Sequence, residues 1–389
     1  MKIGIDARWI LNPEKNPAIG VGHYTYQLIR NLLEIDQKNQ FVLFFDYRVR
    51  EKDVKKFSKP NVEIKYFPWS DYKKYLPGAY SEILGLATLS RNNLDVLLVV
   101  SPDARVPIGY HGKVICVFQD LAVFKFPKLF SEMAKIKAKY NRQAMAKRAD
   151  KIIAVSENTK NDLKEVLNVS AEKIAIIKNG VDERFFEKSV MSEIEARKYL
   201  LENFKISKKY ILFVGTLEPI KNITRLLQSF RIFKEETKKR LGNFPYQLVL
   251  GGKMGWLGSE YFQIAQDLGL ERDVVFSGYV EGEDLKILFE NCEFFIMPSL
   301  HEGFGMSVLE AMACGASCLV SDIPPLKEIA GDDANYFNPL DAGEMAGKMK
   351  MMLEDKRENI SGRERAKKYS WRKCAEETIK LVSNLKRIV

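Results

Sequence analysis

A short window in the second half of the chain combines glycines with two glutamates. Residues 298–310 read Pro-Ser-Leu-His-Glu-Gly-Phe-Gly-Met-Ser-Val-Leu-Glu, between a strand-like apolar run and a helical run. Glycines at 303 and 305 let backbone N–H groups approach a ligand, and a helix start favours negative charge such as a diphosphate. Glu302 and Glu310 can accept hydrogen bonds from paired sugar hydroxyls. The same spacing also fits a tight strand–turn–helix with solvated glutamates.

Two lysines follow strand-like runs in the same half of the chain. Lys221 comes after the run 210–214 and a Leu-Glu-Pro turn, and Lys253 comes after the run 247–251. A lysine at such a position can neutralise a departing diphosphate as a point charge. We favour this role for Lys221, whereas Lys253 fits a solvated loop position equally well.

A glycine pair near the start of the chain raises a second possibility, a dinucleotide site. Gly20 and Gly22 precede a helical run, but the first strand ends near Asp6 and no third glycine follows at the required place. The spacing therefore argues against a dinucleotide fingerprint. The pair suits a loop that approaches a ligand, with Gly22 as the position of close backbone contact.

Strand-like apolar runs alternate with helical patterns throughout. The runs lie at 2–6, 41–45, 62–67, 95–100, 114–119, 151–155, 173–177, 210–214, 247–251, 274–276, 293–297 and 317–320. Continuous apolar runs are typical of strands covered on both faces, and this alternation predicts an α/β fold with doubly wound parallel sheets.

A break in this pattern near residues 183–208 predicts two Rossmann-like domains that face a central cleft. We expect an N-terminal domain at 1–186, a linker at 187–208, a second domain at 209–370 and a final helix at 371–389 packing across the domain junction. Ligands of such sheets bind outside the carboxyl ends of the strands, so two facing domains would share one site.

Composition excludes several classes of protein. Hydrophobic residues make up 46% and charged residues 29%, as in ordinary soluble proteins. No window approaches the ~20 apolar residues of a membrane span, and the start lacks the layout of a signal peptide. Five cysteines without a C-x-x-C pair favour free thiols and the cytoplasm. With three histidines, a His-rich metal site is not expected.

The net charge of +10 lies entirely in the first half. Residues 1–188 contain 32 Lys and Arg against 22 Asp and Glu, whereas 189–389 contain 29 of each. Much of the excess lies between Lys125 and Arg148, where eight basic residues accompany one acid, Glu132. We expect an apolar stripe to be the buried helix face, with the basic residues outside; the stripe is Phe130, Met133, Ile136, Tyr140 and Ala144. Such an outer face suits an anionic membrane, although a solvated helix face is the simpler explanation.

The window at 298–310 is accompanied by further motifs along nearly the whole chain. They are Gly20-Val-Gly22, Gln119-Asp120-Leu121-Ala122, Val155-Ser156-Glu157, Asn179-Gly180-Val181-Asp182, Gly215-Thr-Leu-Glu-Pro-Ile-Lys221-Asn222 and the continuation Glu310-Ala-Met-Ala-Cys-Gly315. Together they resemble the retaining glycosyltransferases of family four, which have the GT-B fold of two Rossmann-like domains. Within that family the chain is most similar to the mannosyltransferase-like subgroup of bacterial surface-glycan synthesis.

The resemblance implies roles for individual residues. Glu310 should hold the ribose of a nucleotide-diphosphate sugar, and Glu302 should contact the transferred sugar. The other implied donor-binding positions are Gly22, Thr216, Lys221, Lys253, Gly303, Phe304, Gly305, Met306, Ser307 and Val308. No cofactor and no metal are implied, since the fold usually binds diphosphate with lysines and helix dipoles.

The pair Gln119-Asp120 departs from the family pattern, which usually shows His-Asp at this strand end. Glutamine can donate and accept hydrogen bonds but cannot take up a proton at neutral pH. Gln119 can therefore replace a positioning histidine but not a proton-transferring one. Asp120 can face the acceptor or cap a helix. The family generally shows no protein nucleophile, and none is nominated here; Glu302, Lys221, Gln119 and Asp120 are the candidate catalytic residues.

The resulting expectation is a transferase that moves a hexose from a nucleotide-diphosphate sugar to a glycan or lipid-linked acceptor in the cytoplasm. Mannose from GDP-mannose is the leading donor, with UDP-glucose and UDP-N-acetylglucosamine open. A sugar-nucleotide epimerase or a non-catalytic glycan- or lipid-binding protein are the alternatives. A nucleic-acid partner is not expected, because no recognised nucleic-acid module is present.

Overall fold

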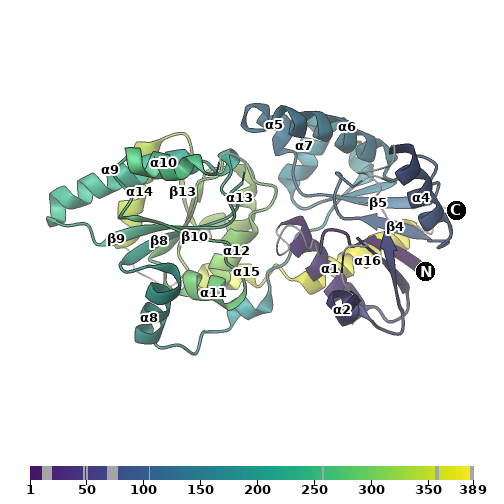
Figure 1. The fold of residues 1–389 in the computed structure, drawn as a ribbon, viewed down its shortest axis with the longest axis horizontal. Coiled ribbons are helices and arrows are strands. Elements are labelled where there is room, and N and C mark those ends of the chain that lie inside the picture. The colour runs from purple at the N-terminus through teal and green to yellow at the C-terminus, as the bar shows by residue number, and fades with distance from the viewer. Residues whose placement is uncertain are drawn as a thin grey trace. The chain divides into compact units, whose positions relative to one another are not determined.

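The chain folds as two compact units in the computed structural model (Figure 1). The described residues are 1–10, 20–46, 49, 51–67, 78–104, 106–255, 258–354 and 359–385. Unit 1 comprises Met1–Gly180 and Trp371–Val389, and unit 2 comprises Val181–Ser370. No helix among the described residues is long and apolar enough to cross a membrane.

Unit 1 contains a parallel sheet in the order β3-β2-β1-β4-β5-β6-β7. Its strands are β1 (Lys2–Asp6), β2 (Gln40–Asp46), β3 (Val62–Phe67), β4 (Val96–Val99), β5 (Lys113–Phe118), β6 (Lys151–Ala154) and β7 (Ile174–Ile176). Its α-helices are α1 (Val21–Ile35), α2 (Glu51–Val54), α4 (Gly78–Ser90), α5 (Ala122–Lys125), α6 (Glu132–Arg148), α7 (Glu157–Leu167) and α16 (Trp371–Leu385). In Figure 1, α1 and α16 cover one face of this sheet, and α6 and α7 cover the other.

Unit 2 repeats this plan with the order β10-β9-β8-β11-β12-β13. Its strands are β8 (Lys209–Val214), β9 (Tyr246–Gly251), β10 (Val274–Gly278), β11 (Phe294–Met297), β12 (Cys318–Ser321) and β13 (Asn335–Phe337). Its helices include η4 (Glu183–Phe186), α8 (Glu193–Phe204), η5 (Pro219–Lys221), α9 (Ile223–Leu241), α10 (Glu260–Asp267), α11 (Gly282–Asn291), α12 (Met306–Ala313), α13 (Pro324–Ala330), α14 (Ala342–Glu354) and α15 (Ile360–Ala366). In each sheet the chain first adds strands on one side of the first strand and then continues on its other side. This is the doubly wound arrangement, in which ligands bind at the carboxyl ends of the strands.

Every predicted strand is present, and the two parallel doubly wound sheets are confirmed. The sequence pattern missed β13, because its residues, Asn-Tyr-Phe, begin with a polar side chain and do not form a continuous apolar run as those of β7 do. The structure divides the chain after Gly180 rather than after residue 186, and the segment expected to be a linker contains α8. A capping box between Ser192 and Glu195 starts that helix. The last helix, α16, belongs to unit 1, where Trp371 packs edge-on against Tyr24 of α1.

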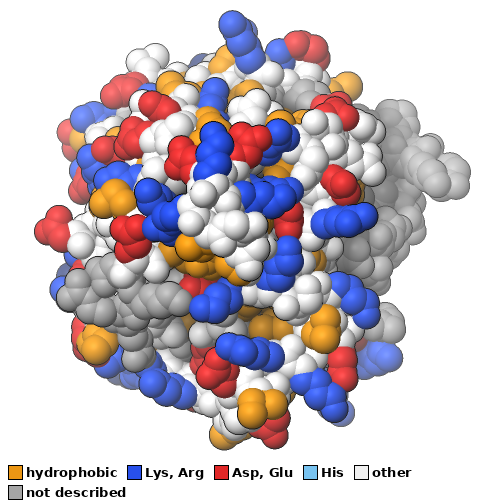
Figure 2. Space-filling view, turned by 90° about the vertical axis from the view of Figure 1, so that its left-hand side faces the viewer, with side chains coloured by type: hydrophobic (Ala, Val, Ile, Leu, Met, Phe, Trp, Pro, Cys, Tyr) orange, Lys and Arg blue, Asp and Glu red, His pale blue; other side chains and the backbone are white. Residues whose placement is uncertain are grey.

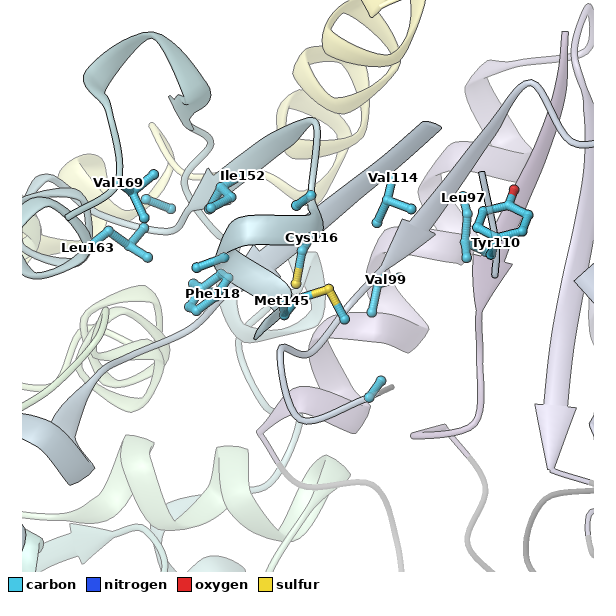
Figure 3. Packing of buried hydrophobic residues seen from close by; sticks show 14 of the residues in the cluster. Leu97, Val99, Tyr110, Val114, Cys116, Phe118, Met145, Ile152, Leu163 and Val169 are labelled. Carbon is cyan, nitrogen blue, oxygen red and sulfur yellow. The ribbon is translucent and has the colours of Figure 1, made fainter. Parts of the chain in front are cut away.

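The predicted buried face of α6 is wrong. Met133, Ile136 and Tyr140 are 61%, 64% and 67% exposed. The inward face is instead made of Ala138, Met145 and Ala146, and Figure 3 shows Met145 beside Cys116 of β5. Small alanines let the helix approach the sheet closely, and a helical period alone cannot tell which of two apolar stripes is the one that packs.

The basic residues of the 125–148 segment do not all lie outside either. Lys125 pairs with Asp162 and Glu165 of α7 at 3.1 Å each. Arg142 is held inward by acidic partners, and Arg148 donates hydrogen bonds to two backbone carbonyls. Figure 2 looks onto unit 2 rather than onto this segment, and there the side chains of both signs are interspersed.

Gly252 sits where the loops after β8 and β9 meet backbone to backbone. Its φ is +146°, and a Cβ at this position would lie 1.9 Å from the carbonyl oxygen of Gly215. We therefore expect Gly252→Ala to lower the free energy of unfolding by about 2 kcal/mol in urea titrations, through overpacking and backbone strain. Gly347→Ala is the matched control, because Gly347 lies within α14 with open space around it. A helix interior prefers alanine, so the control should gain stability, and equal losses in both variants would contradict the argument.

Candidate active site

The loop between β11 and α12 holds its shape through a glycine with two constraints. Gly305 caps α12 with φ +102°, and a Cβ there would lie 2.7 Å from Leu326 and 2.8 Å from Ile329. The loop thus turns sharply into the helix and leaves the first backbone N–H groups of α12 at the carboxyl end of β11. This is the geometry in which a helix start attracts a phosphate.

The structure brings Lys221 and Glu302 into direct contact. Oε1 of Glu302 accepts hydrogen bonds from Nζ of Lys221 and from Oγ of Ser299, each at 2.6 Å. The side chains of Glu302 and Lys221 are 11% and 20% exposed, so this ion pair is largely removed from water. A lysine has three donors, and one is used here. The pair can therefore present ammonium and carboxylate to adjacent parts of one ligand.

Asn222 explains why Lys221 reaches Glu302 from a different strand. Its φ of +60° ends η5 and begins α9, and its Nδ2 donates to the carbonyl oxygens of Pro298 and Pro339 at 3.1 and 2.7 Å. The amide of Leu300 also donates to the carbonyl oxygen of Ile220 at 2.9 Å. These bonds tie the loop after β8 to the loop after β11, so that the two predicted residues are positioned by the fold rather than by their own contact.

Glu310 lies in the second turn of α12 and is 8% exposed. Burial raises the pKa of its carboxyl from 4.5 to about 7; the positive charge of Arg184 opposes the shift and the negative charge of Asp182 adds to it. Among the described residues, none donates a hydrogen bond to this carboxylate. A buried carboxyl with unused acceptor capacity is suited to receive hydroxyl groups of a ligand.

Lys253 is held beside an aromatic ring. Its Nζ lies 4.8 Å from the ring centroid of Tyr279, whose hydroxyl donates to Glu281 at 2.9 Å. The pKa of Tyr279 is raised, first by burial and then by the neighbouring carboxylates of Glu281 and Glu310. Tyr279 therefore lies in the electrostatic neighbourhood of Glu310.

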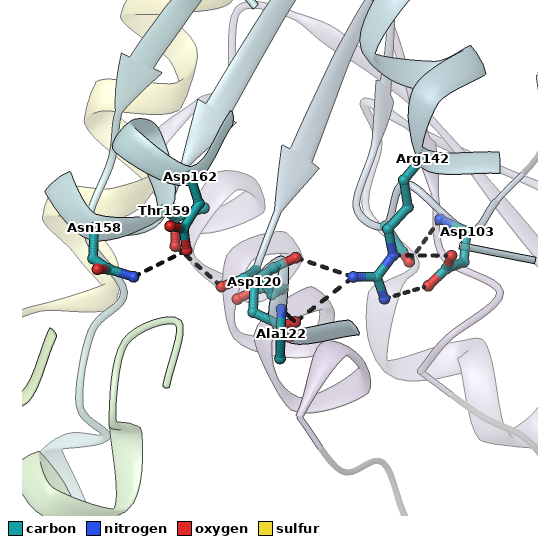
Figure 4. Close-up of polar contacts among 9 residues, drawn as sticks. Asp103, Asp120, Ala122, Arg142, Asn158, Thr159 and Asp162 are labelled. Carbon is teal, nitrogen blue, oxygen red and sulfur yellow. Dashed lines mark hydrogen bonds and ion pairs between the residues drawn. The ribbon is translucent and has the colours of Figure 1, made fainter. Parts of the chain in front are cut away.

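In unit 1, Gln119 and Asp120 directly follow β5 and differ in how they are bonded. Figure 4 shows Asp120 with its partners Ala122 and Arg142. The Nε2 of Gln119 is buried without a hydrogen-bond partner. Asp120 Oδ1 accepts from the amide of Ala122 at 2.9 Å and lies 3.6 Å from Arg142, which also binds Asp103. Asp120 thus binds the first amide of α5 from one residue before the N-cap, which is Leu121, so it is not the helix cap that the sequence allowed. Gln119 keeps an amide donor unused.

Two family comparisons cover most of the chain. Residues 201–371 match the family described as glycosyl transferases group 1, and residues 19–185 match the one described as glycosyltransferase family 4. The chain is thus a glycosyltransferase with a family 4 domain followed by a group 1 domain. This glycosyltransferase is 26% identical over 381 residues to O-antigen chain mannosyltransferase B of Escherichia coli, covering 94% of this chain and 96% of that protein. It is 29% identical to the serotype-specific mannosyltransferase WbdA of Escherichia coli over 70% of this chain but only 33% of that protein.

Solved structures show the same fold at low sequence identity. Sucrose-phosphate synthase from Thermosynechococcus elongatus superposes with a TM-score of 0.77 at 19% identity, covering 100% of both chains. HepE of Anabaena, solved in complex with UDP-glucose, superposes with a TM-score of 0.74 at 16% identity, covering 99% of this chain and 100% of that one. The glycosyltransferase thus has the GT-B fold that the resemblance implied.

The remaining predicted positions of this glycosyltransferase fall into two groups. Gly303, Met306, Ser307 and Thr216 are partly exposed. Val308 and Phe304 are buried in the core of unit 2, and Gly22 is buried in the first turn of α1 in unit 1.

Sequence reasoning missed Arg184. It lies on η4, which packs against α12, and its Nε is 3.5 Å from Asp182. Phe185, fully buried against Phe289, anchors this turn. The motif Asn179-Gly180-Val181-Asp182 ends two residues before Arg184 and so did not include it. The positive charge of Arg184 acts on Glu310 and Tyr279 only in the folded chain.

Proposed function

We propose that this glycosyltransferase is a retaining mannosyltransferase that uses GDP-mannose and a glycan or lipid-linked acceptor hydroxyl in surface-polysaccharide synthesis. The observation that carries the proposal is the near full-length similarity to O-antigen chain mannosyltransferase B, together with the paired Lys221 and Glu302 beside the start of α12. Five free cysteines suit a reducing compartment, which supports action in the cytoplasm.

Each residue has a chemical task in this proposal. Glu310 accepts the ribose hydroxyls, Glu302 accepts hydroxyls of the mannose, and Lys221 with the amino end of α12 counters the diphosphate charge without a metal. The bond between the sugar's anomeric carbon and the diphosphate oxygen breaks. The acceptor oxygen bonds to that carbon on the same face, and its proton passes to the departing phosphate oxygen. Gln119 positions the sugar and takes no proton.

A nucleotide panel tests the donor. At about a hundred times Kd, GDP should stabilise the folded protein by about 2.7 kcal/mol in thermal unfolding, and UDP and ADP should stabilise it much less. Transfer from GDP-mannose with retention of the anomeric configuration, read by NMR of the product, completes the test. Preferential stabilisation by UDP would contradict GDP-mannose as the donor and indicate a UDP-sugar. Rapid epimerisation of the donor without acceptor would contradict the transferase and indicate an epimerase.

A further inference from the structure

Helix α6 presents an apolar stripe to solvent on unit 1. Met133, Ile136 and Tyr140 are spaced by three and four residues, so they line up along one side of the helix, and each is more than half exposed. The opposite side is fixed to the body of unit 1 by Met145 in the core and by the ion pairs of Arg142 with Asp103 and Asp120. The exposed orientation is therefore set by packing and ion pairs on the inner face.

Uncompensated lysines accompany this stripe. Lys128, Lys137, Lys139 and Lys147 are exposed, and none of them has an acidic partner within the part of the chain that the structure describes. The one acid of the helix, Glu132, already pairs with Lys135. By helical geometry, Lys137 and Lys139 flank the apolar stripe on opposite sides, while Lys128 precedes it and Lys147 extends it.

We propose that this face of α6 docks on an anionic lipid bilayer, with the three apolar side chains entering the headgroup boundary and the lysines contacting anionic headgroups. A helix that lies in the membrane interface carries apolar residues on one face with lysines beside them, and lysine stems can bury while their ammonium groups stay in water. Three large apolar side chains are too few for a stable protein partner, which needs about 800 Å² per side. They suffice where shallow insertion and charge act together.

The inference deepens the proposed function, since a lipid-linked acceptor would be met at this surface. It is nevertheless tested without donor or acceptor, so that failure of lipid docking and failure of the proposed reaction give different results.

The test is flotation of the full-length protein with phosphatidylcholine vesicles, with and without phosphatidylglycerol. We expect binding to the anionic vesicles alone, weakening as salt rises. Binding should fall by tenfold or more in each of two triple variants. The serine variant is Met133→Ser/Ile136→Ser/Tyr140→Ser, and the glutamine variant is Lys137→Gln/Lys139→Gln/Lys147→Gln. Lys238→Gln/Lys239→Gln/Lys350→Gln, with the same charge change at exposed positions of unit 2, should bind like the unaltered chain.

A fluorescence readout distinguishes insertion from simple charge attraction. Tyr140→Trp should show a blue-shifted emission on adding anionic vesicles, whereas Lys238→Trp should not. All variants should keep the unaltered urea midpoint and nucleotide affinity. Absent binding, equal binding of the serine variant, or loss of binding in the unit 2 control would overturn the proposal. Self-association that disappears in the serine variant, without vesicle binding, would assign the face to a second copy of the chain instead.

Discussion

Replacing Lys221 with methionine is expected to lower turnover by about a hundredfold and to destabilise the fold at the same time. In the proposed mechanism the substitution removes a charge that counters the departing diphosphate, and deleting one such stabilising group typically costs about a hundredfold in turnover. The loss of stability follows because Glu302, 11% exposed, keeps its charge but loses its cation. Breaking a buried pair on one side costs about 3–5 kcal/mol. Both are measured on one preparation, by kcat at saturating donor and by urea unfolding.

The double variant Lys221→Met/Glu302→Gln separates the two effects. It removes both charges, so stability should return close to that of the unaltered chain while turnover stays low. Lys367→Met is the matched control, since Lys367 forms an exposed pair with Glu364 and should change neither quantity by much. Recovery of turnover in the double variant would show that Lys221 acts only by holding Glu302.

Glu310→Gln is expected to make the protein more stable at neutral and alkaline pH and less able to bind nucleotide. Burial raises the pKa of Glu310 from 4.5 to about 7 in the folded protein. The folded state therefore binds a proton between these values that the unfolded state releases. The stability that this bound proton gives the folded state is fully present below about pH 4.5 and is lost as pH rises through about 7. The free energy of unfolding of the variant, measured relative to that of the unaltered chain, should thus be about 3 kcal/mol higher at pH 8 than at pH 4.

Nucleotide affinity should follow the opposite course. The ionised carboxylate is the better acceptor for two ribose hydroxyls, so affinity should rise with pH up to about 7 and then level off. Glu310→Gln should bind tenfold or more weakly at pH 8 and show no such rise. Arg184→Gln should move the midpoint to higher pH, because the charge of Arg184 lowers the pKa of Glu310. A pH-independent affinity in the unaltered chain would contradict this role, and the exposed Glu376→Gln should behave like the unaltered chain.

The sequence by itself determined the elements and the donor window. Apolar runs of strand length followed by helices predicted both parallel sheets, since strands covered on both faces must be continuously apolar. Short-range geometry also identified the loop into α12, because Gly305 is needed where the backbone turns sharply. Glu302 lies in the loop just before that turn, and Glu310 is placed by helical spacing after it.

Only the tertiary structure decided which residues act on one another. Lys221 meets Glu302 across 81 positions of sequence through bonds from Asn222, and Arg184 reaches Glu310 through the packing of η4 on α12. The tertiary structure also decided that Met133, Ile136 and Tyr140 face outward, against the sequence-based expectation. The physical reason is the same in each case. Periodicity shows which residues share one face of a helix or strand. Partners from distant parts of the chain decide which face packs and which charged groups are removed from water.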